Sequence, residues 1–523
     1  MEMKKLPIGI QDFAEIRENG YAYVDKTGYI PALLQGKYYF LSRPRRFGKS
    51  LFLSTLHAYF AGRRELFNGL AIESADVDWS PNPVLHFDFN SGTFDDEEGL
   101  LEVLASSLSK YEVFYGLEPG EKTRAAIPVR FGSLLEWIRK KTGKKVVVLI
   151  DEYDKPILGR EENLELYERN QTLLKGFYGN LKSQDANIRF VFVTGVARFS
   201  KVSIFSDVNH LDDISLDEAF SDICGWTERE LVDRFSREIE VLSATRNEES
   251  AVTLNALRDY YDGYRFTVTG SRLYNPYSVL RAFKTKEIAP YWFETGTPTF
   301  LVKRFKSRGI FPPDINGKRC TRNELISIGQ SSRSLIPLMF QTGYLTIASY
   351  DKDLGTYELR FPNREVEIGF YENLIGEYVP ETMEPESPFY FTEFMKDLYS
   401  GNPESFMQRL SVMLKGLPTE DHCESAYRSI TYLLSVLSGT QTIAEHHGFK
   451  GRSDLEVLTR NYVYLFEFKY NRSVEEAMEQ IRDRDYAGRY SLESRRVYLI
   501  AANYNERKEE RGLHYRILPL EVF

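Results

Sequence analysis

The sequence predicts an α/β protein with several domains: a parallel sheet with helices on both faces, a helical, winged-helix-like middle region and a C-terminal α/β domain. Three observations lead to this prediction. The chain has 523 residues, which is more than a single hydrophobic core accommodates. From about residue 37, short apolar segments alternate with helical ones, a rhythm typical of parallel sheets. Beyond about residue 285 this alternation gives way to helical segments.

The parallel sheet is predicted from four strand candidates, which are short, apolar and rich in β-branched or aromatic residues. They lie at 37–42, 83–89, 146–150 and 189–195. Between the first two, the segment GKSLFLSTLHAYFAG places Phe52, Leu56 and Phe60 on one helical face and ends at Gly62. We expect this helix to pack on the sheet.

The later part of the chain predicts three further regions. Residues 334–363 indicate a helix followed by a hairpin around 351–355, a pattern that suits a winged-helix-like connector. From about residue 427, the order helix, strand, strand, helix, strand indicates a separate α/β domain. We therefore expect a first domain at 1–285, the connector at 286–375, a helical linker at 376–426 and the last domain at 427–523.

Composition excludes several classes of protein. The chain carries 67 basic and 76 acidic side chains, a net charge of −9, which excludes a protein that coats nucleic acid or anionic membranes by bulk charge. Its three cysteines are Cys224, Cys320 and Cys423, too far apart for a disulfide framework or a CxxC metal site. No window approaches the ~18 apolar residues of a membrane span. We expect a cytoplasmic protein without a membrane partner.

The most informative stretch is FLSRPRRFGKSLFLSTL, a strand candidate that leads through a loop into an amphipathic helix. Gly48 lets the backbone approach a phosphate, Lys49 supplies a cation for the β and γ oxygens, and Ser50 supplies a ligand for Mg²⁺. Arg43 stands where the pattern G-x-x-x-x-G-K-[ST] has its first glycine. The residues expected to bind the nucleotide here are Arg43, Pro44, Arg45, Arg46, Phe47, Gly48, Lys49, Ser50 and Leu51.

Two later strand candidates end in polar residues that complete this pattern. KKVVVLIDEYDKP ends its strand at Asp151 and Glu152, which we expect to hold Mg²⁺ and to polarise the attacking water, respectively. RFVFVTGVARF ends at Thr194, placed like a sensor of the γ-phosphate or the water, with Arg198 nearby. An ordinary strand threonine and a surface arginine are the alternatives for these two. Together the motifs predict a P-loop NTPase that uses ATP and Mg²⁺.

The sequence resembles the AAA-ATPase-like family of bacterial proteins. The resemblance rests on YVDKTGYIPALL (23–34), SRPRRFGKSLFLSTL (42–56), IDEYDKPI (150–157), VTGVARFSKVSIFSDVNHLDDIS (193–215) and YYDGYRF (260–266). It covers about residues 3–285 and implies an ATP-binding P-loop core in which Arg43 is the family's own form of the loop. Asp25 and Lys26 belong to the same motifs, with helix capping as the alternative to a role in the site.

A second set of charged residues lies near the C-terminus, in GRSDLEVLTRNYVYLFEFKYNRSVEEAMEQIRDRDY. Glu467 and Lys469 share one face of a strand candidate because side chains alternate with a period of two. A hairpin would bring Asp454 beside them. Two carboxylates can hold Mg²⁺ while the lysine orients a water for attack on a phosphodiester. The alternative is an ordinary surface ion pair.

Residues around this set could add to it. Glu445 could supply a third carboxylate, and Gln480 and Tyr486 follow on a predicted helix. The region from about 427 to 523 resembles the PD-(D/E)XK nuclease superfamily, which implies a catalytic role for Asp454, Glu467 and Lys469, with Glu445, Gln480 and Tyr486 as further candidates. Five arginines are candidates for phosphate contact, unless they form ion pairs on the helix surface: Arg452, Arg472, Arg482, Arg484 and Arg489.

The two regions together lead to one functional hypothesis and one rival. We expect an ATP-binding and ATP-hydrolysing AAA-like protein whose nucleotide state controls a Mg²⁺-dependent nuclease-like domain acting on DNA or RNA, in defence against foreign nucleic acid by analogy. The rival is a non-cleaving ATP-dependent conformational switch or signalling protein whose C-terminal domain binds a partner. A homo-oligomer stays open, since such ATPases often take an arginine from a neighbouring chain.

Overall fold

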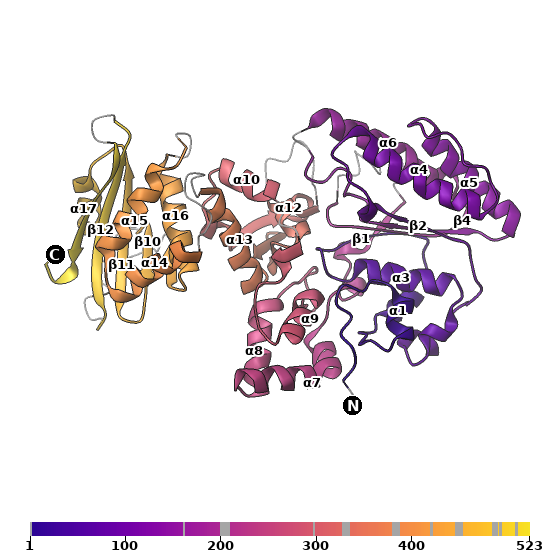
Figure 1. Ribbon diagram of the computed structural model, residues 1–523, viewed down its shortest axis with the longest axis horizontal. Helices are drawn as coiled ribbons and strands as arrows, with labels where there is room; N and C mark the ends of the chain where they lie inside the picture. The colour runs from indigo at the N-terminus through magenta and orange to yellow at the C-terminus, as the bar shows by residue number, and fades with distance from the viewer. Residues whose placement is uncertain are drawn as a thin grey trace. The chain divides into compact units, whose positions relative to one another are not determined.

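The computed structural model describes residues 3–160, 163–198, 210–295, 299–326, 335–378, 388–418, 422–444, 453–483, 490, 494–507 and 511–522 (Figure 1). The chain divides into two compact units. The first comprises residues 1–296 and 317–367, and the second comprises residues 297–316 and 368–523. The range predicted as a connector is thus shared between the units. The four-part division expected from the sequence stays a prediction.

The first unit is built on a five-stranded parallel sheet with the order β2-β3-β4-β1-β5. Its strands are β1 (Tyr38–Ser42), β2 (Val84–Asp88), β3 (Val146–Asp151), β4 (Ile188–Gly195) and β5 (Asp212–Asp213). All residues of β1 and β3 are buried, as expected for strands covered on both faces. Because β4 lies between β1 and β3, the carboxyl ends of these three strands share one edge of the sheet.

Helices cover both faces of this sheet, which confirms the predicted fold class (Figure 1). One face carries α1 (Phe13–Glu18) and α3 (Lys49–Phe60), with α2 (Ile30–Leu33) before β1, and the other carries α4 (Glu97–Phe114), α5 (Ala126–Thr142) and α6 (Leu164–Ser183). On the first face Phe52 of α3 packs against Phe192, with ring centroids 5.8 Å apart. On the second, Phe131 and Phe177 stack at 4.4 Å over the sheet.

A group of three helices follows the sheet and has its own core. These are α7 (Glu228–Arg246), α8 (Ser250–Tyr261) and α9 (Pro276–Thr285). Thr227 and Glu230 form a capping box at the start of α7, and the Asn275 side chain accepts from backbone amides at the start of α9. The core includes Trp226 and Phe235, whose rings stack at 4.9 Å.

The first unit also contains the helix and hairpin predicted over 334–363. α12 (Ile336–Thr342) precedes β7 (Thr346–Asp351) and β8 (Thr356–Arg360), which pair in an antiparallel hairpin. β6 (Lys318–Thr321) pairs with β8, and α11 (Arg322–Ile326) follows β6. The helix and the hairpin expected from the sequence are therefore confirmed, and the winged-helix-like character of the region stays a prediction.

The second unit contains a mixed sheet with the order β13-β12-β11-β10-β9. Only β11 and β12 pair in parallel, and the other described pairs are antiparallel. Helix α17 packs on one face through Ala477 and Ile481, while α14, α15 and α16 lie over the other (Figure 1). The strands are β9 (Gln441–Ala444), β10 (Leu455–Leu458), β11 (Tyr462–Tyr470), β12 (Arg496–Asn505) and β13 (Gly512–Pro519). The helices are α10 (Thr299–Ser307), α13 (Arg364–Tyr378, shared with the first unit), α14 (Pro388–Ser400), α15 (Pro403–Lys415), α16 (Glu424–Leu437) and α17 (Val474–Asp483).

Within the described ranges, no helix is both long enough and apolar enough to cross a membrane.

Candidate nucleotide pocket and carboxylate site

The loop between β1 and α3 has the backbone geometry of a phosphate cradle. Gly48 adopts φ 91°, a left-handed conformation that favours glycine, and Arg46 adopts φ 68°. α3 begins at Lys49, and no side chain caps its first turn. The amides at the start of a helix carry partial positive charge and lack partners within the helix. This turn is therefore suited to an anion.

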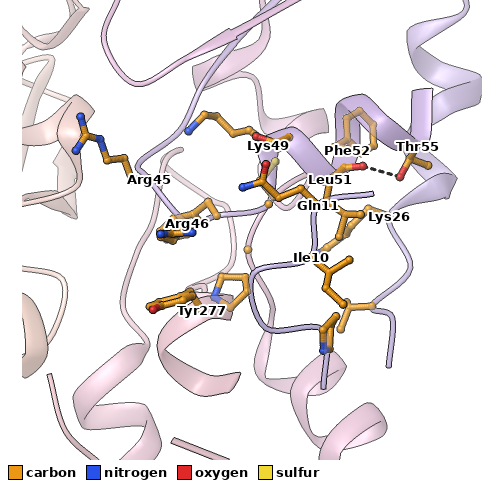
Figure 2. Close-up of a pocket in the computed structure, with 18 of the residues that line it drawn as sticks. Ile10, Gln11, Lys26, Arg45, Arg46, Lys49, Leu51, Phe52, Thr55 and Tyr277 are labelled. Atoms are coloured by element: carbon orange, nitrogen blue, oxygen red, sulfur yellow. Dashed lines mark hydrogen bonds between the residues drawn. The ribbon is translucent and has the colours of Figure 1, made fainter. Parts of the chain in front are cut away.

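A cavity of about 450 Å³ opens in front of this turn (Figure 2). That volume is typical of small-molecule sites. Of the residues expected to bind the nucleotide, Arg45, Arg46, Phe47, Gly48, Lys49, Ser50 and Leu51 line the cavity. Its other walls come from segments far apart in the chain and include Ile10, Lys26, Glu152, Cys224 and Tyr277.

Lys49 is buried and held close to the end of β3. Its ammonium donates to the carbonyl oxygens of Arg43 and Pro44, both at 3.1 Å. Its Nζ also lies 3.4 Å from the Oε1 atom of Glu152. The structure therefore brings together the lysine of the loop and the carboxylate that follows the β3 strand.

The ends of β3 and β4 are joined by hydrogen bonds. Thr194 donates from Oγ1 to Oδ1 of Asp151 at 2.6 Å, and both residues are buried. Asp154 accepts from the amides of Val196 at 3.0 Å and Ala197 at 2.6 Å. Burial raises the pKa of the Asp154 carboxyl to about 7. These bonds fix Asp151 and Thr194 relative to the loop strand β1, which pairs with β4.

Arg43 lies away from the cavity, unlike its neighbours in the loop. Its guanidinium donates to the carbonyl oxygens of Ser42, Ser215, Phe220 and Ser221 at 2.8–3.3 Å. Its Cζ atom lies 4.2 Å from the centroid of the Phe266 ring. The sequence pattern suggested a nucleotide contact for Arg43, whereas these contacts give it a role in holding the base of the loop.

Pro44 and Arg198 also make contacts within the protein. A Cβ atom added at Gly343 would lie 2.6 Å from Cβ of Pro44, so Pro44 is packed directly against that turn. Arg198 forms an ion pair with Asp213 at 2.6 Å, and its amide donates to Gln341. Neither residue is among those that line the cavity.

Lys26 lies at the cavity and forms an ion pair there. It lines the cavity, and its ammonium donates to the carboxylate of Glu230 at 2.7 Å and 2.8 Å. The preceding Asp25 accepts from the amides of Thr27 and Ala71, which agrees with the capping alternative for that residue.

The donor set of the cavity fits a nucleotide with its metal ion. Lys49 and the amides of the helix start supply positive charge for phosphates. Ser50 supplies a hydroxyl next to them, and Glu152 supplies a carboxylate 3.4 Å from Lys49. Oxygen ligands of this kind suit Mg²⁺. Of the two residues expected from the sequence to hold Mg²⁺, Ser50 lines the cavity at the start of α3, whereas Asp151, at the end of β3, is buried and is not among the lining residues.

In the second unit, the predicted hairpin brings the C-terminal carboxylates together. Asp454 directly precedes β10, whose first residue pairs with the residue before Glu467 on β11. The Asp454 carboxylate accepts from the amide of Phe468 at 2.9 Å. Lys469 donates to Oε1 of Glu467 at 2.7 Å, and both side chains are at least nine-tenths buried. Glu467 and Lys469 therefore share one face of the central strand β11, and Asp454 lies at the adjoining end of β10.

A residue that the sequence prediction missed lies beside this set. Glu424 begins α16, the helix over the same sheet. Burial raises the pKa of its carboxyl, and so does the nearby Asp454 charge, while Lys469 and Arg428 act in the opposite direction. An acidic residue in the first turn of an amphipathic helix just before the strands was the signal available in the sequence.

The remaining C-terminal candidates fall into two groups. Gln480 lies partly buried on α17, Arg482 is exposed on the last turn of that helix, and Arg472, also exposed, precedes it. The others, Glu445, Tyr486, Arg452, Arg484 and Arg489, lie outside the described residues.

Within the described residues, no three His, Cys, Asp or Glu side chains are close enough together to hold a metal ion. Asp454 instead faces the Arg428 guanidinium at 3.6 Å.

Comparison with known proteins finds one family match in each of the two regions that hold these sites. Residues 7–205 match a family described as "Predicted AAA-ATPase", and residues 422–512 match the PD-(D/E)XK nuclease superfamily. An uncharacterized protein in the vnfD 5′ region of Azotobacter chroococcum mcd 1 is 39% identical over 521 residues, covering 97% of each chain. The chain belongs to the AAA-ATPase-like family. Its AAA-ATPase-like domain is an ATPase domain, and a PD-(D/E)XK domain follows it, which confirms the predicted architecture.

Proposed function

We propose that this AAA-ATPase-like protein hydrolyses ATP with Mg²⁺ at its P-loop, and that nucleotide binding controls cleavage of DNA or RNA by its PD-(D/E)XK domain. The observation that carries the proposal is the approach of Lys49 to Glu152, with Nζ and Oε1 3.4 Å apart at the edge of a cavity of nucleotide size. The same arrangement of a loop lysine and a carboxylate after a strand suits phosphoryl transfer to water.

In the ATPase domain, each residue has a distinct proposed role. Lys49 and the amides of the α3 start bind the phosphates, and Glu152 orients the attacking water and accepts its proton. Ser50 and Asp151 are the residues that would hold Mg²⁺. The ion supplies positive charge that neutralises the phosphate oxygens. Thr194 keeps Asp151 in place through its hydrogen bond at 2.6 Å.

In the PD-(D/E)XK domain, Asp454 and Glu467 are the residues that would hold a divalent metal ion, which would supply a Lewis acid for phosphodiester cleavage. Lys469 lies 2.7 Å from Glu467 and positions the attacking water. Glu424 is a further carboxylate within electrostatic range of Asp454 and Lys469, and Gln480 is a candidate from α17. The combination of an ATPase domain with this domain supports a role against foreign nucleic acid.

The test is cleavage of labelled single- and double-stranded DNA and RNA in the presence of Mg²⁺ or Mn²⁺. Wild type is expected to cut at least one substrate, and Asp454→Ala is expected to lose that cleavage. A matched control is Glu475→Ala, which removes an exposed carboxylate of the same domain that forms an ion pair with Arg516. Equal cleavage by wild type and Asp454→Ala would contradict the assignment.

One observation favours a second candidate function. Asp454 and Glu467 each face a cation, Arg428 at 3.6 Å and Lys469 at 2.7 Å, so both negative charges are already neutralised. A domain with this charge pattern would suit an ATP-dependent switch that binds a partner without cutting it. Binding of Mn²⁺ to wild type but not to Asp454→Ala would favour the nuclease over this switch.

A further inference from the structure

The cavity of the ATPase domain extends beyond the phosphate loop. One part is lined by the loop and the start of α3, where Lys49 lies. The other part is lined by Ile10 from the N-terminal segment and by Tyr277 and Leu280 from α9 (Figure 2). A triphosphate at the first part would leave this second part for the rest of the nucleotide.

In the second part of the cavity, the surrounding structure holds the Tyr277 side chain in place. Tyr277 lies in the first turn of α9, where Oδ1 of Asn275 accepts from the amide of Tyr277 at 3.0 Å. Its ring packs against the buried core of α7, α8 and α9. A cap and a packed core together restrict the rotamer of such a side chain. The Tyr277 ring is therefore held in place at the cavity wall.

A cation lies over this ring. The Arg46 guanidinium is 4.7 Å from the centroid of Tyr277, and both residues line the cavity. In the part of the chain that the structure describes, no carboxylate forms an ion pair with Arg46. We call Tyr277 and Arg46 the stacking platform. It presents flat, polarisable groups on one side of a cavity whose neighbouring wall is apolar.

We propose that the nucleobase of the bound nucleotide stacks on the stacking platform, against the apolar side chains of Ile10 and Leu280. Nucleobases stack on aromatic rings and on guanidinium planes, and such contacts tolerate any base because every base has a π-face. Arg46 is three positions before Lys49, so the base and phosphate subsites are continuous. This inference rests on the proposed binding of the triphosphate at the P-loop.

The test compares ATP with inorganic tripolyphosphate, which lacks the base and ribose. Affinities of the full chain for both ligands are measured by calorimetry. Tyr277→Leu keeps an apolar side chain for packing but removes the ring, and is expected to weaken ATP binding by about tenfold without changing tripolyphosphate binding. Tyr277→Phe keeps the ring and is expected to bind ATP like wild type.

Two results would overturn the inference: unchanged ATP affinity in Tyr277→Leu, or an equal loss of affinity for both ligands. Lys49→Ala reports separately on the P-loop and is expected to lose both ligands. If Lys49→Ala binds both ligands like wild type, the proposed phosphate site is wrong, and the stacking platform is wrong with it. If only the Tyr277 result fails, the phosphate site stands without the platform.

Discussion

Arg43 gives the sharpest test of how the loop is held, because its position in the motif and its position in the fold point to different roles. We consider the substitution Arg43→Met, which keeps an unbranched apolar side chain but removes the guanidinium. The side chain is only 1% exposed and donates four hydrogen bonds to backbone carbonyl oxygens. Burial lowers its pKa to about 10, so it is still protonated at neutral pH.

The expected loss follows from these contacts. Each buried carbonyl that loses its donor costs about 1–3 kcal/mol, and a second lone pair or a bound water reduces that cost. Removing the buried guanidinium returns part of the free energy spent on its desolvation. The balance predicts that Arg43→Met lowers the free energy of unfolding by about 3–5 kcal/mol. Arg43→Lys keeps a cation but has one nitrogen in place of three. Its free energy of unfolding is expected to lie between those of wild type and Arg43→Met.

Tryptophan fluorescence in a denaturant titration measures this loss selectively. All four tryptophans of the chain, Trp79, Trp137, Trp226 and Trp292, belong to the first unit. Under conditions where Arg43→Met is folded, its affinity for ATP is expected to stay within about threefold of wild type. A variant as stable as wild type that no longer binds ATP would show instead that Arg43 is a phosphate ligand.

Three further predictions concern the surroundings of the loop. Glu152→Gln is expected to lower ATP turnover by at least about 100-fold, measured by phosphate release, with ATP still bound; unchanged turnover would point to a domain that binds without hydrolysing. Gly343→Ala is expected to destabilise the first unit by about 1–3 kcal/mol in the fluorescence titration, because its φ is 92° and the new methyl would meet Pro44; wild-type stability would show that the turn adapts. For Asp154, a raised pKa means that the folded state holds a proton which the unfolded state releases, so stability falls as pH rises from about 4 to 7. Asp154→Asn should flatten this slope, and an equal slope in both proteins would assign it to other groups.

The sequence predicted the parts of this protein that depend on local patterns. The strands β1, β3 and β4 were found because parallel strands with nearly all residues buried are continuous apolar runs. Gly48, Lys49 and Glu152 were found because the chemistry of a phosphate loop dictates their spacing from strand ends. The hairpin that places Asp454 beside Glu467 followed from the period of two along a strand.

Contacts between distant segments could not be predicted in this way. Three of the four acceptors of Arg43 lie more than 170 residues later in the chain, and no local pattern indicates them. Tyr277 reaches the cavity only because α9 packs beside the loop. Glu424 precedes Asp454 by 30 positions and reaches the site only through the packing of α16 on the sheet. Such residues require the three-dimensional fold.

Nucleotide binding at the P-loop is proposed to control cleavage at the PD-(D/E)XK domain. The most direct measurement is the rate of nucleic-acid cleavage with Mg²⁺, with and without ATP, for wild type and Lys49→Ala. ATP is expected to change the rate for wild type and to have no effect on Lys49→Ala, while Asp454→Ala is expected to be inactive under both conditions. Cleavage by wild type and Lys49→Ala at the same rate, whether ATP is present or absent, would contradict the coupling.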